Sequence, residues 1–368
     1  MNSQQQNEKE EKDKRKQQHD NDVLFIKESV VRKLLNWNDC VDAMESALVA
    51  MSSASSSLSS TSSSSSSQVA NRDEPFSYQT PRTFTMAGND GVLLTMPGYA
   101  ANYTLSMVTG NNEKHSTLAC KLVTSFAKNS QLNPPLPTIL ATILLFNSST
   151  GKLKAIVDGT DITAWRTASV SLVATKYLHR PQQNSILAIV GTGTQGRIHA
   201  LAMLNYFPNA FTRINLWNRT KARADCLRDE LNELFPEVEI VVVDTSVECV
   251  IDADCIVTAT NSPLPLFELK DLKEDVHINA IGAGINHHSE LPMEIYQFAD
   301  VFIESNVGIQ TELKGIAEFI NGEIGEIIVG RKHLDDASGK RRTVFQSMGN
   351  AIEDGIMANL IYQKFIEL

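Results

Sequence analysis

The stretch SILAIVGTGTQG occupies residues 185–196 and decides the fold. It begins as an apolar strand, places Gly191, Gly193 and Gly196 in GxGxxG spacing, and continues into the helical stretch RIHALAML. In a Rossmann unit the first glycine makes the tight turn, the second lets the backbone approach a pyrophosphate, and the third allows close packing of helix on strand. The phosphates then lie at the helix N-terminus. Strand, glycine loop and helix together predict a dinucleotide site.

The second strand of this unit, RINLWN, indicates which dinucleotide is bound. It ends at Asn218, where an NAD enzyme usually carries an acid for the ribose hydroxyls. This chain instead reads Asn218-Arg219-Thr220-Lys221, with Arg223 close behind. An acid would repel a 2′-phosphate, whereas an arginine binds it through charge-assisted hydrogen bonds and a threonine hydroxyl adds another. Cations at a helix start are mildly unfavourable alone, which favours a compensating anion. We therefore expect NADP(H) as the cofactor.

The pattern of expected strands and helices changes at Pro181. Before it, residues 81–159 read as strands separated by Gly, Pro and Asn turns, and a helix is expected from about Thr160 to Leu178. After it, apolar strands alternate with helical stretches, which is the pattern of βαβ units around a parallel sheet buried on both faces. The chain closes with residues 351–366, which carry one apolar helix face.

Composition excludes several classes of protein. The 368 residues are 42% hydrophobic and carry a net charge of −10, which argues against a general nucleic-acid binder. No apolar run approaches the length of a membrane span, and the polar, charged start excludes a secretory signal. Five cysteines without a CxxC pair indicate free thiols in a reducing compartment. We expect a cytoplasmic protein with no nucleic-acid or membrane partner.

Two segments have too little apolar content to fold. Residues 1–21 are rich in Gln, Lys and Glu, and residues 52–67 are almost all serine. Neither buries enough apolar surface to offset its chain entropy, so both are expected to be disordered. Residues 23–50 between them read as a pair of short helices of the folded body. The serine tract is then a loop insertion, not a domain linker.

A series of blocks carries a family resemblance from about Arg82 to the C-terminus. In order, they are PRTF, LLTMPGY, CKLVTSF, TILATILLF, KAIVDGTDITAWRTASVS, IVGTGTQG, LWNRTK, HINAIGA and VFQSMGNAIEDGIMANLIY. The series resembles the ornithine cyclodeaminase/mu-crystallin family, and its mu-crystallin branch in particular. The resemblance implies an α/β homodimer with a Rossmann-type doubly wound parallel sheet inserted in an α+β substrate-binding and dimerisation domain. We expect the NADP-binding domain over residues 179–343 and the other over 22–178 plus 344–368.

The same resemblance assigns three cations to the substrate. Arg82 in PRTF, Lys121 in CKLVTSF and Arg166 in AWRTAS match the family's clamp for a carboxylate-bearing substrate. Arginine offers a bidentate fork, while a partly desolvated lysine can hold or donate a proton. We expect the remaining cofactor contacts at Thr194 and Gln195 in the glycine loop, Thr258 and Asn261 after the CIVTAT strand, and Ser347 in FQSMG.

Departures from the family pattern narrow the reaction. Ornithine cyclodeaminases and the related alanine dehydrogenases carry a catalytic Asp at the position of Gly284, so deamination of ornithine is not expected here. His287 and His288 form an adjacent pair more typical of an exposed loop than of catalysis. Their spacing resembles no zinc site and no third ligand is evident, so we expect no metal.

The resemblance leads to one hypothesis and two alternatives. The hypothesis is NADPH-dependent reduction of a cyclic ketimine, such as Δ1-piperideine-2-carboxylate or Δ1-pyrroline-2-carboxylate, to a cyclic amino acid. Arg166 and Arg82 would hold the carboxylate, and Lys121 would hold or supply the proton at the imine nitrogen. The first alternative is an NADP-dependent binding protein for thyroid-hormone-like molecules. The second is an amino-acid dehydrogenase or cyclodeaminase of the same family, which Gly284 disfavours.

Overall fold

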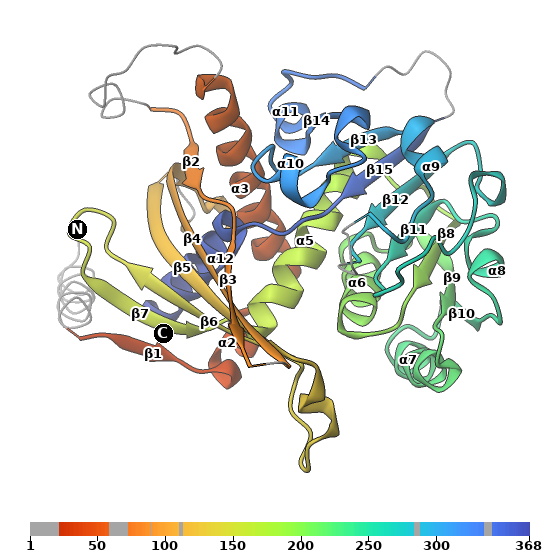
Figure 1. The fold of residues 1–368 in the computed structure, drawn as a ribbon, viewed down its shortest axis with the longest axis horizontal. Helices are drawn as coiled ribbons and strands as arrows, with labels where there is room; N and C mark the ends of the chain where they lie inside the picture. The colour runs from red at the N-terminus through yellow and green to blue at the C-terminus, as the bar shows by residue number, and fades with distance from the viewer. Residues whose placement is uncertain (1–21, 59–72, 89, 110–112, 283–287, 335–340) are drawn as a thin grey trace, which may run out of the picture. The chain divides into compact units, whose positions relative to one another are not determined.

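The structure is a computed structural model that describes residues 22–58, 73–88, 90–109, 113–282, 288–334 and 341–368. The chain divides into two compact units, traced in Figure 1. The described residues among 1–50, 64–163 and 351–368 form the first unit, and those among 51–63 and 164–350 form the second. The helix α5 (Thr160–Leu178) carries the chain from one unit into the other.

The first unit is built on a seven-stranded sheet. Its strands pair in an antiparallel manner, apart from a parallel pairing of the first strand with β7. The order is β1 (Leu24–Ile26), β7 (Leu153–Asp158), β6 (Ile139–Phe146), β5 (Lys114–Phe126), β4 (Gly91–Thr104) and β2 (Phe76–Gln79), with β3 (Thr83–Ala87) also on β4. The long β4 and β5 alternate buried and less buried residues, as a sheet covered on one face requires.

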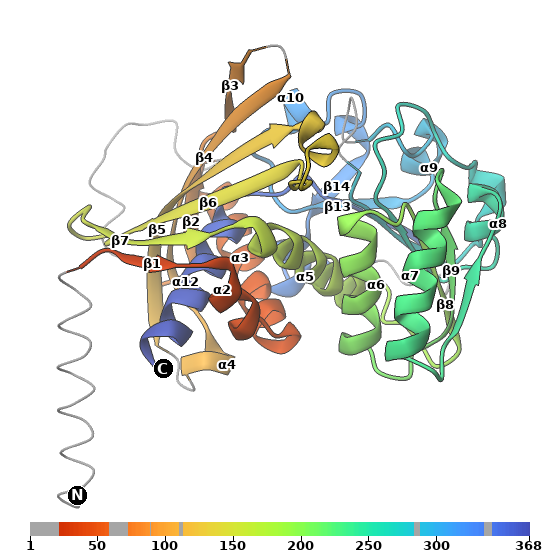
Figure 2. The same ribbon diagram turned by 90° about the horizontal axis from the view of Figure 1, so that it is seen from below.

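Helices cover one face of this sheet, as Figure 2 shows from below. The last helix, α12 (Ala351–Ile366), packs on β4, β5 and β6, and all its residues through Tyr362 are buried. Asn359 on α12 donates to the Tyr103 hydroxyl of β4 at 2.7 Å, and Tyr103 also bonds Thr117 at 2.5 Å. The helices α2 (Glu28–Leu34) and α3 (Trp37–Leu58) complete the layer.

The second unit is a parallel sheet of eight strands. The order is β10 (Glu239–Val242), β9 (Phe211–Trp217), β8 (Ser185–Val190), β11 (Cys255–Thr258), β12 (Val276–Ala280), β15 (Arg342–Gln346), β13 (Asp300–Ile303) and β14 (Ile320–Glu323). Every pairing in it is parallel. The strands β11 and β12 are buried along their whole length, as expected for central strands of a parallel sheet.

The helices of the second unit are the crossovers of the sheet. The chain passes from β8 through α6 (Thr194–Tyr206) to β9 and through α7 (Lys221–Leu234) to β10, and α8 (Ser246–Val250) then leads to β11 on the other side of β8 (Figure 1). The shorter helices are α9 (Met293–Gln297), α10 (Ile309–Glu312) and α11 (Ile324–Ile328). The expected α/β fold with a doubly wound parallel sheet is confirmed.

Three expectations from the sequence differ from the structure. The helix α3 continues through Leu58 into the serine tract, because buried Met51 and Ser52 anchor it and serine costs a helix only about 0.5 kcal/mol relative to alanine. The strands β1 and β2 were not expected. The domain boundaries expected after residues 178 and 343 also differ, because the two units divide after residues 163 and 350, most of α5 belongs to the second unit, and β15 is a strand of the second sheet. Residues 1–21 and 59–67 lie outside the described residues.

The described residues contain neither a membrane-spanning helix nor a metal-binding cluster. None of their helices combines the length and apolar character needed to cross a membrane. No group of three or more His, Cys, Asp or Glu side chains among them is arranged to hold a metal ion.

Candidate functional site

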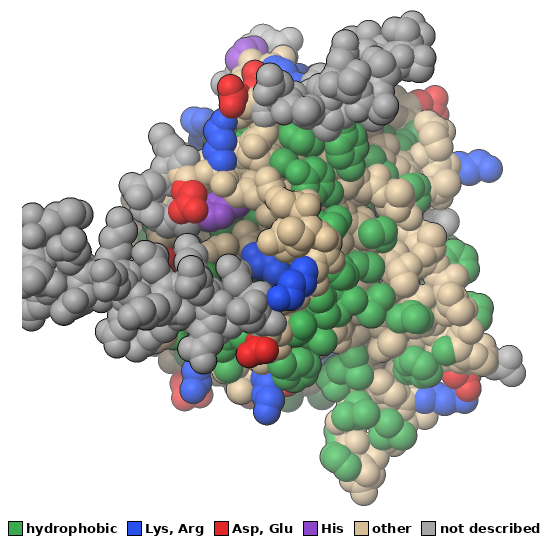
Figure 3. Space-filling view, turned by 90° about the vertical axis from the view of Figure 1, so that its left-hand side faces the viewer, with side chains coloured by type: hydrophobic (Ala, Val, Ile, Leu, Met, Phe, Trp, Pro, Cys, Tyr) green, Lys and Arg blue, Asp and Glu red, His purple; other side chains and the backbone are tan. Residues whose placement is uncertain are grey.

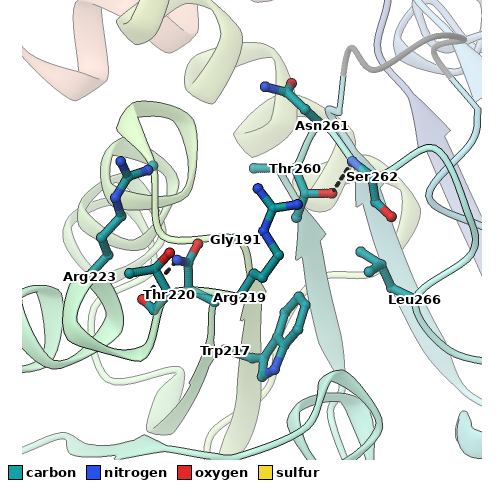
Figure 4. Close-up of a pocket in the computed structure, with 12 residues that line it drawn as sticks. Gly191, Trp217, Arg219, Thr220, Arg223, Thr260, Asn261, Ser262 and Leu266 are labelled. Atoms are coloured by element: carbon teal, nitrogen blue, oxygen red, sulfur yellow. Dashed lines mark hydrogen bonds between the residues drawn. The ribbon is translucent and has the colours of Figure 1, made fainter. Parts of the chain in front are cut away.

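A cavity of about 240 Å³ lies at the carboxyl ends of β8, β9 and β11. The strand order reverses at β8, because β9 and β10 lie on one side of it and β11, which follows β10 in the chain, lies on the other. Open parallel sheets bind ligands in the crevice at such a point. Figure 4 shows the side chains that surround it. The lining residues are Gly191, Gly193, Trp217, Asn218, Arg219, Thr220, Arg223, Ala259, Thr260, Asn261, Ser262 and Leu266.

Two glycines of the loop after β8 are required by close contacts. Gly191 has a φ of +103°, and a Cβ there would lie 2.7 Å from the carbonyl oxygen of Ala259. A Cβ on Gly196 would lie 1.8 Å from the carbonyl oxygen of Gly191. Both positions therefore exclude any larger residue, and the loop can turn tightly into α6. The N-terminus of α6 has no side-chain cap and no acid in its first turn, so its N–H groups suit a pyrophosphate.

Asn218 braces the loop from the neighbouring strand. Its Oδ1 accepts from the backbone N–H of Thr192 at 3.1 Å, and its Nδ2 donates to the carbonyl of Thr220 at 3.0 Å. The amide thus joins the glycine loop to the turn that begins α7. A carboxylate could not make the second bond, because it has no N–H to donate.

The start of α7 is the cationic side of the cavity. Arg219 and Arg223 line it, and neither forms an ion pair with a residue in the described part of the chain. In Figure 4 Arg219 extends between Trp217 and Thr260. Thr220 is the N-cap residue of α7 but makes no capping bond with its side chain, and the first turn contains no acid. This site suits a phosphate monoester, which can accept from the uncapped N–H groups, the Thr220 hydroxyl and the two guanidinium groups.

The buried carboxylate of Glu290 fixes the wall of the cavity that the loop after β11 forms. Glu290 is 2% exposed, and its Oε1 accepts from the backbone N–H of Thr260 at 2.6 Å and from the Thr260 hydroxyl at 2.5 Å. Burial raises the pKa of Glu290, while the bonds from Thr260 act in the other direction. The Thr260 hydroxyl in turn accepts from the backbone N–H of Ser262 at 3.0 Å. The loop after β11 is therefore fixed where it lines the cavity.

Six of the expected cofactor residues line this cavity. They are Gly191, Gly193, Asn218, Arg219, Thr220 and Asn261. Thr194, Gln195 and Gly196 form the first turn of α6 beside it.

The other three expected contacts have different surroundings. Lys221 pairs with Asp244, Nζ to Oδ1 at 2.5 Å, and does not line the cavity. Thr258 is fully buried within β11. Ser347 donates its hydroxyl to Glu304 at 2.7 Å.

The first unit contains a buried ion pair at an expected catalytic residue. Lys121 lies in the middle of β5, between Met96 of β4 and Ile143 of β6. Its Nζ lies 2.5 Å from Oδ2 of Asp354 in the first turn of α12, and the two side chains are 2% and 1% exposed. Burying two charges is costly unless they are paired, so a pair this enclosed suggests a role beyond stability.

Arg166 lies in the second unit, on α5. It is 7% exposed, and its guanidinium packs against Gly349 in the turn after β15. Its charge adds to burial in lowering the pKa of His199, to about 4. His199 is fully buried on α6, where Nδ1 bonds the carbonyl of Gln195 at 2.7 Å and Nε2 bonds the Ser171 hydroxyl at 3.0 Å.

Three further sequence candidates are less informative. Arg82 is half-buried directly before β3 in the first unit. His288 is half-buried and makes an edge contact with Tyr296 at 6.4 Å, so it is not the exposed loop residue that was expected. His287 and Gly284 lie outside the described residues.

Sequence reasoning missed Asp354, Glu290 and the cavity residues Trp217, Thr260 and Ser262. The signal for Thr260 and Ser262 was their place on either side of Asn261, after a buried strand. Asp354 lies in the first turn of α12, where acidic residues are common in any helix, and its partner Lys121 is far away in the sequence. No local pattern connects it with Lys121.

Comparisons with known proteins agree with this geometry. The sequence profile of the ornithine cyclodeaminase/mu-crystallin family matches residues 24–367. The ketimine reductase mu-crystallin of Rattus norvegicus is 33% identical over 285 residues, which cover 76% of this chain and 82% of the relative. A Δ1-pyrroline-2-carboxylate reductase of Bacillus cereus is 32% identical over 261 residues, covering 68% and 78% of the two chains.

A solved structure matches nearly the whole fold. It is the Δ1-pyrroline-2-carboxylate reductase of Thermococcus litoralis in complex with NADH and L-proline. The TM-score is 0.75 at 26% identity, and the match covers 94% of this chain and 98% of the other.

Proposed function

The chain belongs to the ornithine cyclodeaminase/mu-crystallin family, and on this premise we propose that it reduces small cyclic ketimines to cyclic amino acids. Δ1-Piperideine-2-carboxylate and Δ1-pyrroline-2-carboxylate are the substrates proposed, and relatives at 32–33% identity carry the names of such reductases. The observation that carries the proposal is that this chain combines a dinucleotide cavity with the buried cations Lys121 and Arg166.

We propose NADP(H) as the cofactor. A 2′-phosphate at the start of α7 would accept from Arg219 and Arg223 and from the Thr220 hydroxyl. None of the described residues that line the cavity is acidic, so nothing there would repel the added charge. The bound nicotinamide supplies a hydride to the C=N carbon.

The protein's own groups bind the substrate and manage one proton. Arg166 and Arg82 hold the ring carboxylate, and Lys121 keeps the imine nitrogen protonated or hydrogen-bonded. Asp354 holds the Lys121 ammonium in place and stabilises its charge in a buried position. Hydride addition to a protonated imine gives the neutral amine directly, so charge placement is the main contribution of these residues.

A homodimer is the proposed assembly. The first unit exposes apolar side chains on β3, β6 and the segment 127–138, including Phe84 at 69% and Met86 at 62%. Figure 3 shows hydrophobic side chains gathered on the face of the molecule that it views. Exposed apolar patches of this kind mark interaction surfaces. A cytoplasmic location is also proposed, and it is supported by five cysteines that are all free thiols.

Loss of NADPH absorbance with each ketimine tests the proposal. Pyruvate with ammonia is the control substrate pair for a dehydrogenase, and ornithine is the control for a cyclodeaminase. We expect turnover only with the cyclic ketimines, at a kcat/KM within the usual enzyme range of about 10⁴–10⁸ M⁻¹s⁻¹. Tight binding of an iodothyronine without any turnover would instead favour the binding-protein alternative.

A further inference from the structure

A second buried carboxylate lies at the carboxyl edge of the parallel sheet. Glu304 directly follows β13 and is fully buried. Ile303 of β13 is in register with Gln346 of β15, so the next residues along the two strands, Glu304 and Ser347, are neighbours. A carboxylate in such a place must have its oxygens satisfied by hydrogen bonds.

Three successive residues supply those bonds. The Ser347 hydroxyl donates to Oε1 of Glu304 at 2.7 Å, and the backbone N–H of Met348 lies 3.0 Å from each carboxylate oxygen. The backbone N–H of Gly349 donates to Oε1 at 3.2 Å. One side chain therefore fixes the whole turn from Ser347 to Gly349.

The far side of this turn faces the Arg166 guanidinium. Gly349 has a φ of +72°, and a Cβ built on it would lie 2.8 Å from both Nη1 and Nη2 of Arg166. The backbone of the turn thus forms one wall of the space that the guanidinium occupies. Arg166 is buried, so a shift of this wall changes where its fork of donors points.

We propose that Glu304 is a positioning residue for substrate recognition, acting through the turn 347–349 to aim the Arg166 guanidinium at the substrate carboxylate. The inference rests on the carboxylate-binding role proposed for Arg166. A bidentate contact depends on geometry to a fraction of an ångström, so an arginine held by a rigid wall binds better than one free to turn.

Glutamine at this position would break the arrangement without changing its size. Its Nε2 amide group, a donor, would face N–H groups that are also donors, so at least one bond to the turn is lost. Glu304→Gln should therefore loosen the turn and weaken carboxylate binding. Because the change lies outside the cavity lining, the dinucleotide should bind as before.

The test measures two dissociation constants by calorimetry. The probes are NADP⁺ alone and, in its presence, pyrrole-2-carboxylate, a planar carboxylate that cannot accept a hydride at a C=N bond. Glu304→Gln should weaken pyrrole-2-carboxylate about tenfold or more and leave the NADP⁺ value within about twofold. The matched variant is Glu290→Gln, an equally buried carboxylate that holds Thr260 in the cavity wall, and it should weaken NADP⁺ instead.

Two further variants separate positioning from general stability. Gly349→Ala changes the contact between the turn 347–349 and the Arg166 guanidinium directly. It should therefore also weaken pyrrole-2-carboxylate and not NADP⁺, even if Glu304→Gln folds poorly. In an Arg166→Ala background, Glu304→Gln should have no further effect on pyrrole-2-carboxylate, since the residue acts only through that arginine. A full additional loss there, or an equal weakening of NADP⁺, overturns the proposal.

The outcome also distinguishes this inference from the proposed function. If the wild type reduces ketimines but Glu304→Gln binds the carboxylate normally, only the inference fails. If no ketimine is reduced yet carboxylate binding depends on Arg166 and Glu304, only the proposed reaction fails. A wild-type protein that neither reduces a ketimine nor binds pyrrole-2-carboxylate overturns both.

Discussion

Arg219 and Lys221 are two residues apart in the sequence, yet they have different neighbours. Arg219 lines the cavity, whereas Lys221 is engaged with Asp244. The sequence analysis predicted that both side chains contact the 2′-phosphate, because a sequence shows where cationic residues cluster along the chain. It could not show that an acid 23 residues downstream would take one of them.

That difference gives a matched pair of variants. Arg219→Ala should raise KM for NADPH about 10–100-fold, because a charge-assisted contact of about 1.5–3 kcal/mol is lost. KM for NADH should hardly change, since NADH has no 2′-phosphate. Lys221→Ala should leave both values within about twofold. Steady-state kinetics with the two cofactors decide the point, and equal KM values for NADH and NADPH in the wild type would contradict the cofactor proposal.

Lys121 and Arg166 should respond differently to substitution. Lys121→Met should lower kcat by about 10²–10⁴-fold, as expected for a lost general acid. Arg166→Ala should mainly raise KM for the ketimine, because substrate and transition state both need the carboxylate contact. The measurement is full kinetics with one ketimine and saturating NADPH. Wild-type kcat in Lys121→Met would remove the proton role from that residue.

Asp354 offers a test of why Lys121 is paired. In Asp354→Asn the ammonium stays buried without its counter-charge, which favours loss of its proton. The alkaline limb of the kcat profile should therefore move to lower pH, by more than about one unit. The acid limb is the internal control, since Asp354 has no part in it. An unchanged alkaline limb would mean that Asp354 contributes packing alone.

Helices, strands and turns that depend on their own local sequence were predicted well. The helices α5 and α12 begin and end where the sequence indicated, and the glycines of the loop after β8 turn as their spacing required. Short or distant elements were not foreseen. Three-residue β1 pairs with β7 and buries Ile26, and no property of Leu24–Ile26 alone indicates that partner.

The packing of α5 on α6 carries a pH dependence. His199 has a folded pKa of about 4, below the value of about 6.5 in an unfolded chain. The unfolded state therefore binds more protons as pH falls from about 6.5, and stability present above that value is lost toward pH 4. The loss attributable to this residue is about 3 kcal/mol. The pKa of His199 is lowered by burial of the ring and, to a smaller extent, by the positive charge of Arg166, while the bond to the Gln195 carbonyl acts in the other direction.

Urea unfolding at several pH values measures this effect. His199→Gln should flatten the dependence of the unfolding free energy between about pH 6.5 and pH 4.5, although it lowers stability near neutral pH. His333→Gln replaces an exposed histidine and should leave the slope as it is in the wild type. Identical slopes for wild type and His199→Gln would refute the assignment.

At the scale of the whole molecule, the apolar surface of the first unit predicts its assembly. Phe84 and Met86 are on the same face of β3, two residues apart, and both are exposed. Light scattering should give about twice the chain mass of 40.6 kDa for the wild type. Phe84→Glu with Met86→Glu should give the monomer, because two charges cannot be buried in an apolar contact. Phe298→Glu, at an equally exposed aromatic in the second unit, is the control.

The place of α12 in the sheet of the first unit has a consequence for synthesis. The last strand of that sheet ends at Asp158, and the helix that covers it begins only at Ala351. At about 5–20 residues per second, a ribosome needs roughly 10–40 s to produce the residues between them. During that interval residues 164–350 of the second unit can fold as a continuous stretch, while the parts of β4, β5 and β6 that pack against α12 stay uncovered. The Lys121 ammonium acquires its counter-charge only when α12 has been made, so a nascent chain cut short before residue 351 lacks the Asp354 partner of Lys121.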